Sequence, residues 1–166
     1  MTKTTRIGLL VISILVALDQ ITKLLIKTQL YLGEEIPVIP QFFTITSHRN
    51  DGAAWGIFSG NMLFFYLITL IAGVLFYLLL KESDVTTKKF YSYGIFLMVA
   101  GGIGNFIDRL AYKQVVDFID IDIFSYTTFP IFNIADICLV IGMIMFTLDV
   151  IIEEVFYGNH HRNTTK

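Results

Sequence analysis

Four apolar stretches, each roughly the 20 residues that a bilayer-spanning helix needs, constrain the fold of this chain more than any other feature of its sequence. The sequence lacks the series of alternating segments, each of about 10 residues, that a membrane β-barrel would need. The sequence therefore predicts an α-helical integral membrane protein, built as a single membrane-embedded domain over residues 1–166. The four transmembrane helices are expected approximately over residues 7–26, 62–80, 90–110 and 132–152.

Composition excludes two other classes of protein. Hydrophobic residues make up 55% of the 166 residues and charged residues only 16%, whereas about 25% of a typical soluble domain is charged. A chain this short exposes too much surface to hide so many apolar side chains in one soluble core, and it is too apolar to be disordered. The net charge of −2 gives no basis for contacts with phosphate groups, so no nucleic-acid partner is expected.

Basic residues predict the orientation of the helices. Lys3 and Arg6 precede the first stretch, three lysines lie within residues 81–89, and Arg162 and Lys166 follow the fourth stretch. Because cytoplasmic loops carry an excess of Lys and Arg, both termini of this multi-pass chain are expected in the cytoplasm. The first stretch is expected to be a retained helix rather than a cleaved signal peptide, since it contains charged residues and no small-residue cleavage site follows it.

The two remaining segments, 27–61 and 111–131, are expected outside the cytoplasm, and both predict β-structure. The first has β-branched and aromatic residues followed by an Asn-Asp-Gly turn, which indicates a short strand or hairpin at the membrane surface. The second contains the alternating run VVDFIDIDIF, which puts Asp117 on an aliphatic face and Asp120 and Asp122 on the opposite, wet face. A lone carboxylate on a buried face is costly unless it is paired or used.

Ionisable residues also occur within the apolar stretches, where they are costly and indicate function. Asp19 and Lys23 are spaced i, i+4 near the outer end of the first stretch, so their side chains can meet. The alternative interpretation is an ion pair at the interface in which Lys23 snorkels toward water.

The end of the third stretch is polar along one helical face. Gly101, Asn105 and Asp108 share that face, Gly104 lies beside them, and Arg109 lies about 100° further round. Glycine lets a neighbouring helix approach closely, so Asn105 and Asp108 would face that helix or a cavity. The alternative is a packing face that an Asp108–Arg109 pair closes at the level of the lipid headgroups.

The start of the fourth stretch offers a second carboxylate. Asn133 is a good N-cap, and Asp136 as the third helical residue would complete a capping box. Capping alone leaves Asp117 unexplained, however, and Asp117 and Asp136 are expected at the same depth. Two close carboxyl groups cannot both ionise easily, so one can accept a proton from water while the other donates to a carbonyl, as in aspartic peptidases. A site at this depth implies a substrate in the membrane.

Other reactive residues carry weaker signals. Cys138 is expected to be a buried, inert thiol. His160 and His161 lack a third ligand nearby in the sequence, so no metal site is expected there. Trp55, with Phe58 nearby, is expected to be an interfacial aromatic anchor.

Five motifs in one order give the chain a resemblance to a known family. They are DQITK (19–23), NDGAAW (50–55), GGIGNFIDR (101–109), VVDF (115–118) and FPIFNIAD (129–136). Each is weak alone, but together, in this order and spacing, they resemble bacterial lipoprotein signal peptidase, or signal peptidase II, over essentially the whole chain. Trp55 stands where the family usually has Phe, which is a conservative departure.

The resemblance implies an intramembrane aspartic endopeptidase with four transmembrane helices and a small extracytoplasmic β-structure, in the bacterial cytoplasmic membrane with its active site near the outer face. Such enzymes cut lipid-modified prolipoproteins just before the cysteine that carries diacylglyceryl. They need no metal or other cofactor, contact membrane lipid and are inhibited by globomycin. The residues carried over by motif are Asp117 and Asp136 as the catalytic pair, Asn50, Asn105, Arg109 and Asn133 as substrate-binding residues, and Asp19, Lys23, Gly52, Gly104 and Asp108 as supporting residues.

Without that resemblance, the residues leave two alternatives open. A small proton-coupled transporter could also line a cavity with carboxylates. Four spans are few for a transporter, and the acidic residues cluster at one end rather than forming a relay across the bilayer. A membrane assembly subunit is the other alternative.

Overall fold

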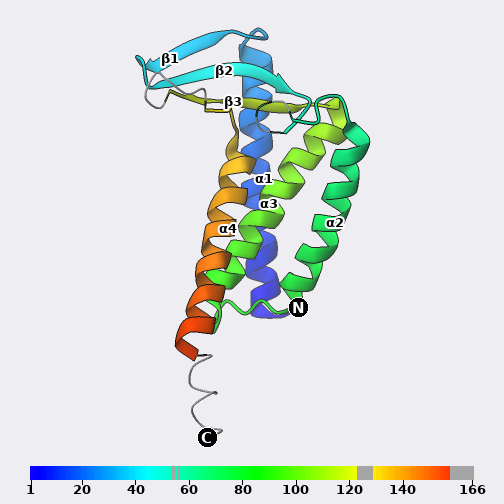
Figure 1. The fold of residues 1–166 in the computed structure, drawn as a ribbon, viewed down its shortest axis with the longest axis vertical. Coiled ribbons are helices and arrows are strands. Elements are labelled where there is room, and N and C mark those ends of the chain that lie inside the picture. The colour runs from blue at the N-terminus through cyan, green and yellow to red at the C-terminus, as the bar shows by residue number, and fades with distance from the viewer. Residues whose placement is uncertain (54, 56, 123–128, 158–166) are drawn as a thin grey trace, which may run out of the picture.

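A computed structural model describes residues 1–53, 55, 57–122 and 129–157 of the chain. The long helices lie side by side, with a small sheet across one end of the bundle and the N-terminus at the other (Figure 1). The helices are α1 (Lys3–Gln29), α2 (Met62–Lys81), α3 (Lys89–Tyr112) and α4 (Ile134–Ile152), which continues into the short π-helix η2 (Glu153–Tyr157). The strands are β1 (Glu35–Ile39), β2 (Phe43–Asn50) and β3 (Val115–Ile121).

All four helices are long and apolar enough to cross a membrane, which confirms the predicted helical membrane fold. Each of three helices begins where a side chain caps it. Thr2, Asn61 and Asn133 accept hydrogen bonds from backbone N–H groups in the first turns of α1, α2 and α4. The cap at Thr2 explains why α1 starts before the expected residue 7, because a capped polar turn extends the apolar helix.

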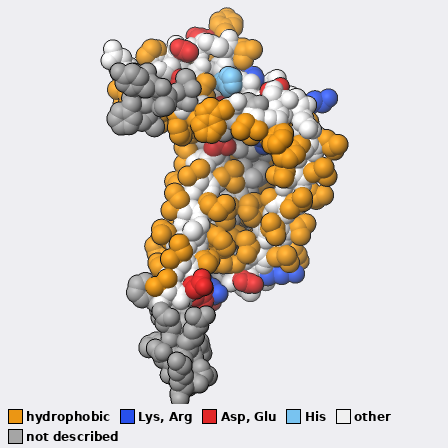
Figure 2. Space-filling model, in the orientation of Figure 1, with side chains coloured by type: hydrophobic (Ala, Val, Ile, Leu, Met, Phe, Trp, Pro, Cys, Tyr) orange, Lys and Arg blue, Asp and Glu red, His pale blue; other side chains and the backbone are white. Residues whose placement is uncertain are grey.

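The central helix of the bundle is α3, which packs against each of the other three helices. Its contact with α4 is close because both helices carry glycine there. A Cβ atom on Gly142 would lie 2.6 Å from the carbonyl oxygen of Gly94, so the two backbones almost touch. The outer surfaces of the helices remain apolar, and Figure 2 shows hydrophobic side chains over the flanks, with charged side chains gathered at the two ends. Apolar flanks and charged ends are the distribution expected of helices that cross a lipid bilayer.

The sheet is antiparallel with the order β1-β2-β3. Strands β1 and β2 form the hairpin predicted for the first intervening segment. In β3, Asp117 is buried and Asp120 is partly exposed, as are its neighbours Ile119 and Ile121; Asp122, just beyond the strand, is exposed.

The predicted wet face of β3 is wrong at its first two positions. Val116 and Phe118 are 1% and 8% exposed, although they share strand parity with Asp120. The first half of β3 is covered on both sides, because it packs against α1 and α3 and its residue Phe118 donates a backbone hydrogen bond to Phe132. Burial along β3 therefore does not alternate: the first four residues are buried and the last three are partly exposed.

Candidate active site

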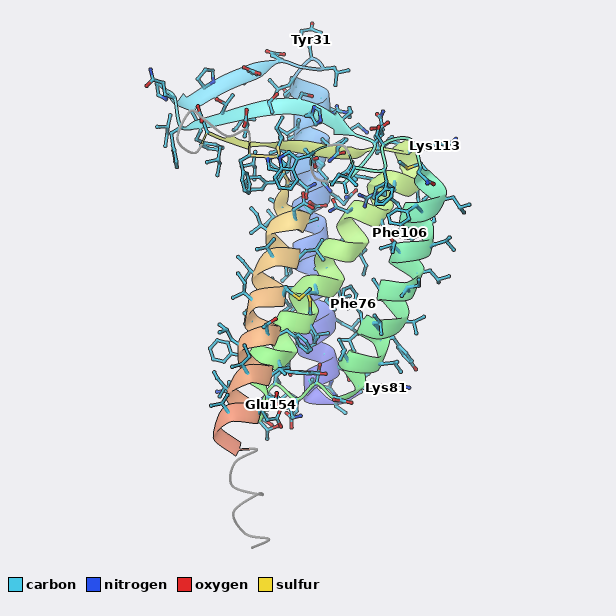
Figure 3. The ribbon with its side chains drawn as sticks, in the orientation of Figure 1. Tyr31, Phe76, Lys81, Phe106, Lys113 and Glu154 are labelled. Atoms are coloured by element: carbon cyan, nitrogen blue, oxygen red, sulfur yellow. The ribbon has the colours of Figure 1, made fainter. Side chains whose placement is uncertain are left out.

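Two carboxylates reach the same cavity from different elements. Asp117 is the third residue of β3, and Asp136 lies in the first turn of α4. Both line a cavity of about 1440 Å³, whose walls are mainly apolar side chains of α2, α3 and α4. Phe76 and Phe106, labelled in Figure 3, belong to those walls. The convergence expected from the sequence is therefore present in the fold.

Asp117 is held by two amide side chains. Asn50 Nδ2 donates to its Oδ2 at 2.9 Å, and Asn133 Nδ2 donates to its Oδ1 at 2.7 Å. Burial raises the pKa of Asp117 to about 6, and the charge of Asp136 contributes to that rise, whereas the two amide donors act in the opposite direction. A carboxyl group with such a pKa can exist in either protonation state near neutral pH.

Asp136 has two roles in the structure. Its Oδ2 accepts a hydrogen bond from the backbone N–H of Asn133 at 3.1 Å, which completes the predicted capping box. Its Oδ1 accepts from Asn105 Nδ2 at 2.7 Å, on the side of the cavity. The cap therefore uses one oxygen atom, and the other belongs to the polar network that reaches Asp117.

The amides of Asn105 and Asn133 connect the two carboxylates. Asn133 Nδ2 donates to Asn105 Oδ1 at 3.1 Å as well as to Asp117. Lys23 Nζ donates to the same Asn105 oxygen at 3.0 Å. Because this oxygen already accepts two donors, the NH₂ group of Asn105 must face Asp136.

Lys23 lies at the centre of a second polar group, between α1 and α3. Its Nζ is 2.9 Å from Asp19 Oδ2 and 3.1 Å from Asp108 Oδ2. All three side chains are at most 2% exposed, so the interpretation of Lys23 as a snorkelling residue is wrong. The alternative Asp108–Arg109 pair is not formed either: in the part of the chain that the structure describes, Asp108 pairs with Lys23.

The remaining residues selected from the motifs surround these two groups. The guanidinium carbon of Arg109 lies 4.5 Å from the ring centroid of Phe65, and Arg109 lines the cavity beside the two carboxylates. The backbone N–H of Gly52 donates to Asn50 Oδ1 at 2.9 Å, which leaves the Nδ2 of Asn50 for Asp117. Gly104 has no room for a side chain, because a Cβ there would lie 2.5 Å from Asp19 Oδ2.

Comparison with known proteins identifies this arrangement. The family model described as signal peptidase (SPase) II matches residues 11–152. The chain belongs to the signal peptidase II family. A lipoprotein signal peptidase of Staphylococcus aureus strain JH9 is 49% identical over 139 residues, which is 83% of each chain, and that of strain Newman matches equally well.

Two solved structures of bacterial membrane enzymes share this fold. The first, determined in meso at 2.3 Å resolution, is 44% identical with a TM-score of 0.81 and covers 89% of each chain. The second, determined in meso at 1.9 Å, is 46% identical with a TM-score of 0.76 and covers 86% of this chain and 91% of its own. The family is one of peptidases, so the cavity described above is the candidate active site of a membrane-embedded peptidase.

One polar residue of this signal peptidase II member was not selected from the sequence. Gln20 Nε2 lies 3.1 Å from Asp19 Oδ2, 3.1 Å from the carbonyl oxygen of Gly104 and 3.2 Å from Asp108 Oδ1. Its position beside Asp19 in an apolar stretch was the available signal. The rotation of α1 against α3, which decides whether Gln20 faces lipid or protein, cannot be obtained from periodicity alone.

The weaker candidates have less to do with the site. Cys138 is buried on α4, as expected for a structural thiol. Among the described residues, no group of three or more His, Cys, Asp or Glu side chains could hold a metal ion. His160 and His161 lie outside the described residues. Trp55 is 70% exposed and lies at the cavity, so its role as an interfacial anchor stays a prediction.

Proposed function

We propose that this chain is an intramembrane aspartic endopeptidase that removes signal peptides from diacylglyceryl-modified prolipoproteins, cutting just before the lipidated cysteine. The observation that carries the proposal is the pair Asp117 and Asp136, which come from different elements, line one cavity and are joined through two amide side chains. The names of the curated relatives, lipoprotein signal peptidases, support this class of substrate.

The two carboxylates have different roles in the proposed reaction. The ionised one accepts a proton from a water molecule, whose oxygen attacks the carbonyl carbon of the scissile peptide bond. The protonated one donates a hydrogen bond to the carbonyl oxygen and stabilises the negative charge that develops there. The proton taken from water then passes to the leaving nitrogen as the peptide bond breaks. Either carboxylate can fill either role, and the raised pKa of Asp117 suits both.

Arg109, Asn50, Asn105 and Asn133 are the residues proposed to position the substrate backbone. Arg109 lies in the cavity wall and can donate to peptide carbonyl groups. The three asparagines hold the carboxylates in the structure, and a bound peptide would share their donors. Asp19, Lys23, Gly52, Gly104 and Asp108 support these residues from behind.

The shape of the cavity suits a substrate that arrives through the membrane. Its lining extends from Asp117 and Asp136 along α2 as far as Leu80, near the opposite end of that helix. An apolar signal-peptide helix and the acyl chains of the lipidated cysteine would bury their surfaces against this lining. Membrane lipid would occupy it between turnovers, and a globomycin-type inhibitor would compete for its polar end.

The proposed topology puts both termini in the cytoplasm and the sheet, with the catalytic pair, at the outer face of the cell membrane. Single cysteines introduced into a Cys138→Ala background test it. Tyr31→Cys, on the exposed turn before β1, should react with a membrane-impermeant maleimide added to intact cells. Thr87→Cys, on the exposed loop between α2 and α3, should react only after the membrane is opened. The reverse pattern would overturn the topology.

The proposed reaction is tested with purified protein in detergent. A lipidated prolipoprotein should yield a fragment that begins at the modified cysteine, identified by its mass, and the same precursor without its diacylglyceryl group should be a poor substrate. Asp117→Asn and Asp136→Asn provide inactive controls. A protein that leaves the precursor intact, but carries protons when reconstituted in liposomes, would instead be the small transporter.

A further inference from the structure

We propose that Gln20 is a positioning residue for the catalytic pair: its amide bridges two buried carboxylates, Asp19 and Asp108, that hold the two chain segments bearing Asp117 and Asp136. This inference rests on the proposed function, and it assigns a role to a residue outside the cavity. Asp19, Gln20, Lys23 and Asp108 are called the carboxylate clamp below.

The clamp holds each catalytic residue through the residue before it. Asp19 Oδ1 accepts a hydrogen bond from the backbone N–H of Ala135 at 2.9 Å. Asp108 Oδ2 accepts one from the backbone N–H of Val116 at 3.0 Å. Ala135 directly precedes Asp136, and Val116 directly precedes Asp117. The distance between the two clamp carboxylates therefore helps to set the distance between the two catalytic ones.

Two donors on α1 hold the clamp carboxylates together. Lys23 binds the Oδ2 atoms of Asp19 and Asp108, and Gln20 donates to Asp19 Oδ2 and Asp108 Oδ1. Gln20 and Lys23 are spaced i, i+3 on one helix, so they reach the pair from neighbouring positions. Gln20 also donates to the carbonyl oxygen of Gly104, which ties the same amide to the backbone of α3.

Gln20 contributes hydrogen-bond donors without a positive charge, which a second cation could not do. Lys23 already supplies one positive charge to two carboxylates, and an amide supplies further donors without adding a charge to the buried group. Loss of these donors would leave Asp108 Oδ1 without the Gln20 contact and would let β3 and the start of α4 shift relative to each other. Displacement of reacting groups by about 1 Å can lower a rate by about 100-fold.

The test replaces Gln20 with a side chain of similar size that cannot donate. Gln20→Met should lower kcat by about 10- to 100-fold, as expected for small displacements of reacting groups, while KM stays within about twofold because the cavity walls are unchanged. Gln29→Met is the matched control, since Gln29 is exposed on the same helix, and it should behave as wild type. The milder variant Gln20→Asn keeps an amide donor on a shorter side chain and should give an intermediate kcat. Its kcat tests the proposal if Gln20→Met folds poorly.

A second readout separates positioning from loss of folded protein. The charge of Asp136 raises the pKa of Asp117, and Lys23 lowers it. If the catalytic carboxylates move apart in Gln20→Met, the carboxyl titration of Asp117, followed by infrared spectroscopy, should shift toward acid. A lower melting temperature alone would leave that titration where it is in the wild type.

The outcomes distinguish this inference from the proposed function. An active wild type together with a Gln20→Met variant of unchanged kcat and unchanged titration overturns the role of Gln20 and leaves the peptidase proposal intact. A wild type that does not cleave lipidated prolipoprotein overturns the peptidase proposal. In that case the shift in the Asp117 titration still decides whether the clamp positions the pair.

Discussion

The molecule contains two pairs of aspartates, and each pair joins residues from different elements. Asp19 and Asp108 lie at the contact of α1 and α3, while Asp117 and Asp136 come from β3 and α4. The first pair has the ammonium group of Lys23 within 3.1 Å of both carboxylates. The second pair receives its hydrogen bonds from amide groups and lines a cavity.

The difference shows how one residue type serves two purposes. The carboxylates of the first pair meet a buried cation, which compensates their charge and fixes their positions. A carboxylate that meets only amides and another carboxylate keeps a raised pKa, as Asp117 does, and the cavity gives it access to water and substrate. The two pairs are neighbours, because Asn105 contacts both Lys23 and Asp136, so the cation rather than distance distinguishes them.

The largest expected effect comes from neutralising Asp117 and Asp136, the proposed catalytic pair. Asp117→Asn and Asp136→Asn should each lower single-turnover cleavage of a lipidated prolipoprotein by at least about 10²- to 10⁴-fold, because an amide cannot exchange the proton. The double variant should be no worse than either single one, since both residues act in one step.

The same variants should keep the fold. Asn can still accept a hydrogen bond, so Asp136→Asn retains much of a cap whose full loss costs about 0.5–2 kcal/mol. Its melting temperature and its binding of uncleaved substrate should stay near those of the wild type. An Asp136→Asn protein that cleaves normally but melts markedly lower would reduce Asp136 to a helix cap and remove it from the catalytic pair.

The next largest expected effect is a loss of stability when Lys23, the cation between Asp19 and Asp108, is replaced. Lys23→Met removes the cation between two buried carboxylates and should lower the free energy of unfolding by about 3–5 kcal/mol, as expected for a broken buried ion pair. Denaturant unfolding in detergent, followed by tryptophan fluorescence, measures it.

Lys27→Met is the control for that change. Lys27 lies on the same helix with its Nζ 3.2 Å from the ring centroid of Tyr112, a partly exposed contact whose loss should cost about 1 kcal/mol or less. Equal losses for the two lysines would mean that the cation of the buried group is dispensable and that the contrast between the two pairs has another origin.

Much of this fold can be predicted from the sequence because its physical causes are local. Apolar length fixes four helices, and the Asn-x-x-Asp pattern at Asn133 and Asp136 correctly predicts a capping box. The hairpin follows from its β-branched and aromatic residues, although the Asn-Asp-Gly turn comes at the end of β2 rather than between the two strands. Asp117 is buried as predicted, but so are its neighbours on the opposite face. That the chain forms a single domain stays a prediction.

The parts that could not be predicted depend on how elements pack. Whether Lys23 snorkels or is buried depends on the rotation of α1 against α3, which is fixed by contacts such as a Cβ-free Gly104 against Asp19. Burial of Val116 and Phe118 depends on which helices cover β3. The role of Gln20 depends on the same rotation: its place beside Asp19 in an apolar stretch marks it as unusual but does not decide whether it faces protein or lipid.

A smaller effect is expected in the dependence of stability on pH. The pKa of Asp117 is raised from 3.8 to about 6 in the folded chain, first by burial and then by the charge of Asp136. The folded state therefore binds this proton more tightly than the unfolded state does. The resulting stabilisation is fully present below pH 3.8 and is lost as the pH rises through about 6. Its upper bound is about 3 kcal/mol, at 1.36 kcal/mol per pKa unit.

Asp117→Asn isolates that contribution because it cannot ionise. The melting temperature of the wild type should fall relative to that of Asp117→Asn as the pH is raised from about 4 to about 7. A constant difference between the two proteins over this range would place the ionisation of Asp117 at its ordinary value and weaken its contrast with the salt-bridged pair.

The smallest expected effect concerns the two carboxylates that follow Asp117 along the chain, Asp120 and Asp122. Asp120 lies opposite Thr44 on the partly exposed half of β3, and Asp122 lies exposed just beyond the strand, where its backbone N–H donates to the carbonyl oxygen of Phe42. Neither residue lines the cavity, and Asp→Asn retains both the backbone contact and the side-chain volume. Asp120→Asn and Asp122→Asn should therefore change kcat by no more than about twofold, since charged groups at the protein surface contribute little. Cleavage rates and melting temperatures, measured beside Asp117→Asn, provide the check. Asp120→Asn could instead prove as inactive as Asp117→Asn while melting normally. In that case the position of a carboxylate along β3 would matter more for activity than the face on which it lies. Burial beside amide donors would then no longer distinguish a proposed catalytic aspartate from its neighbours.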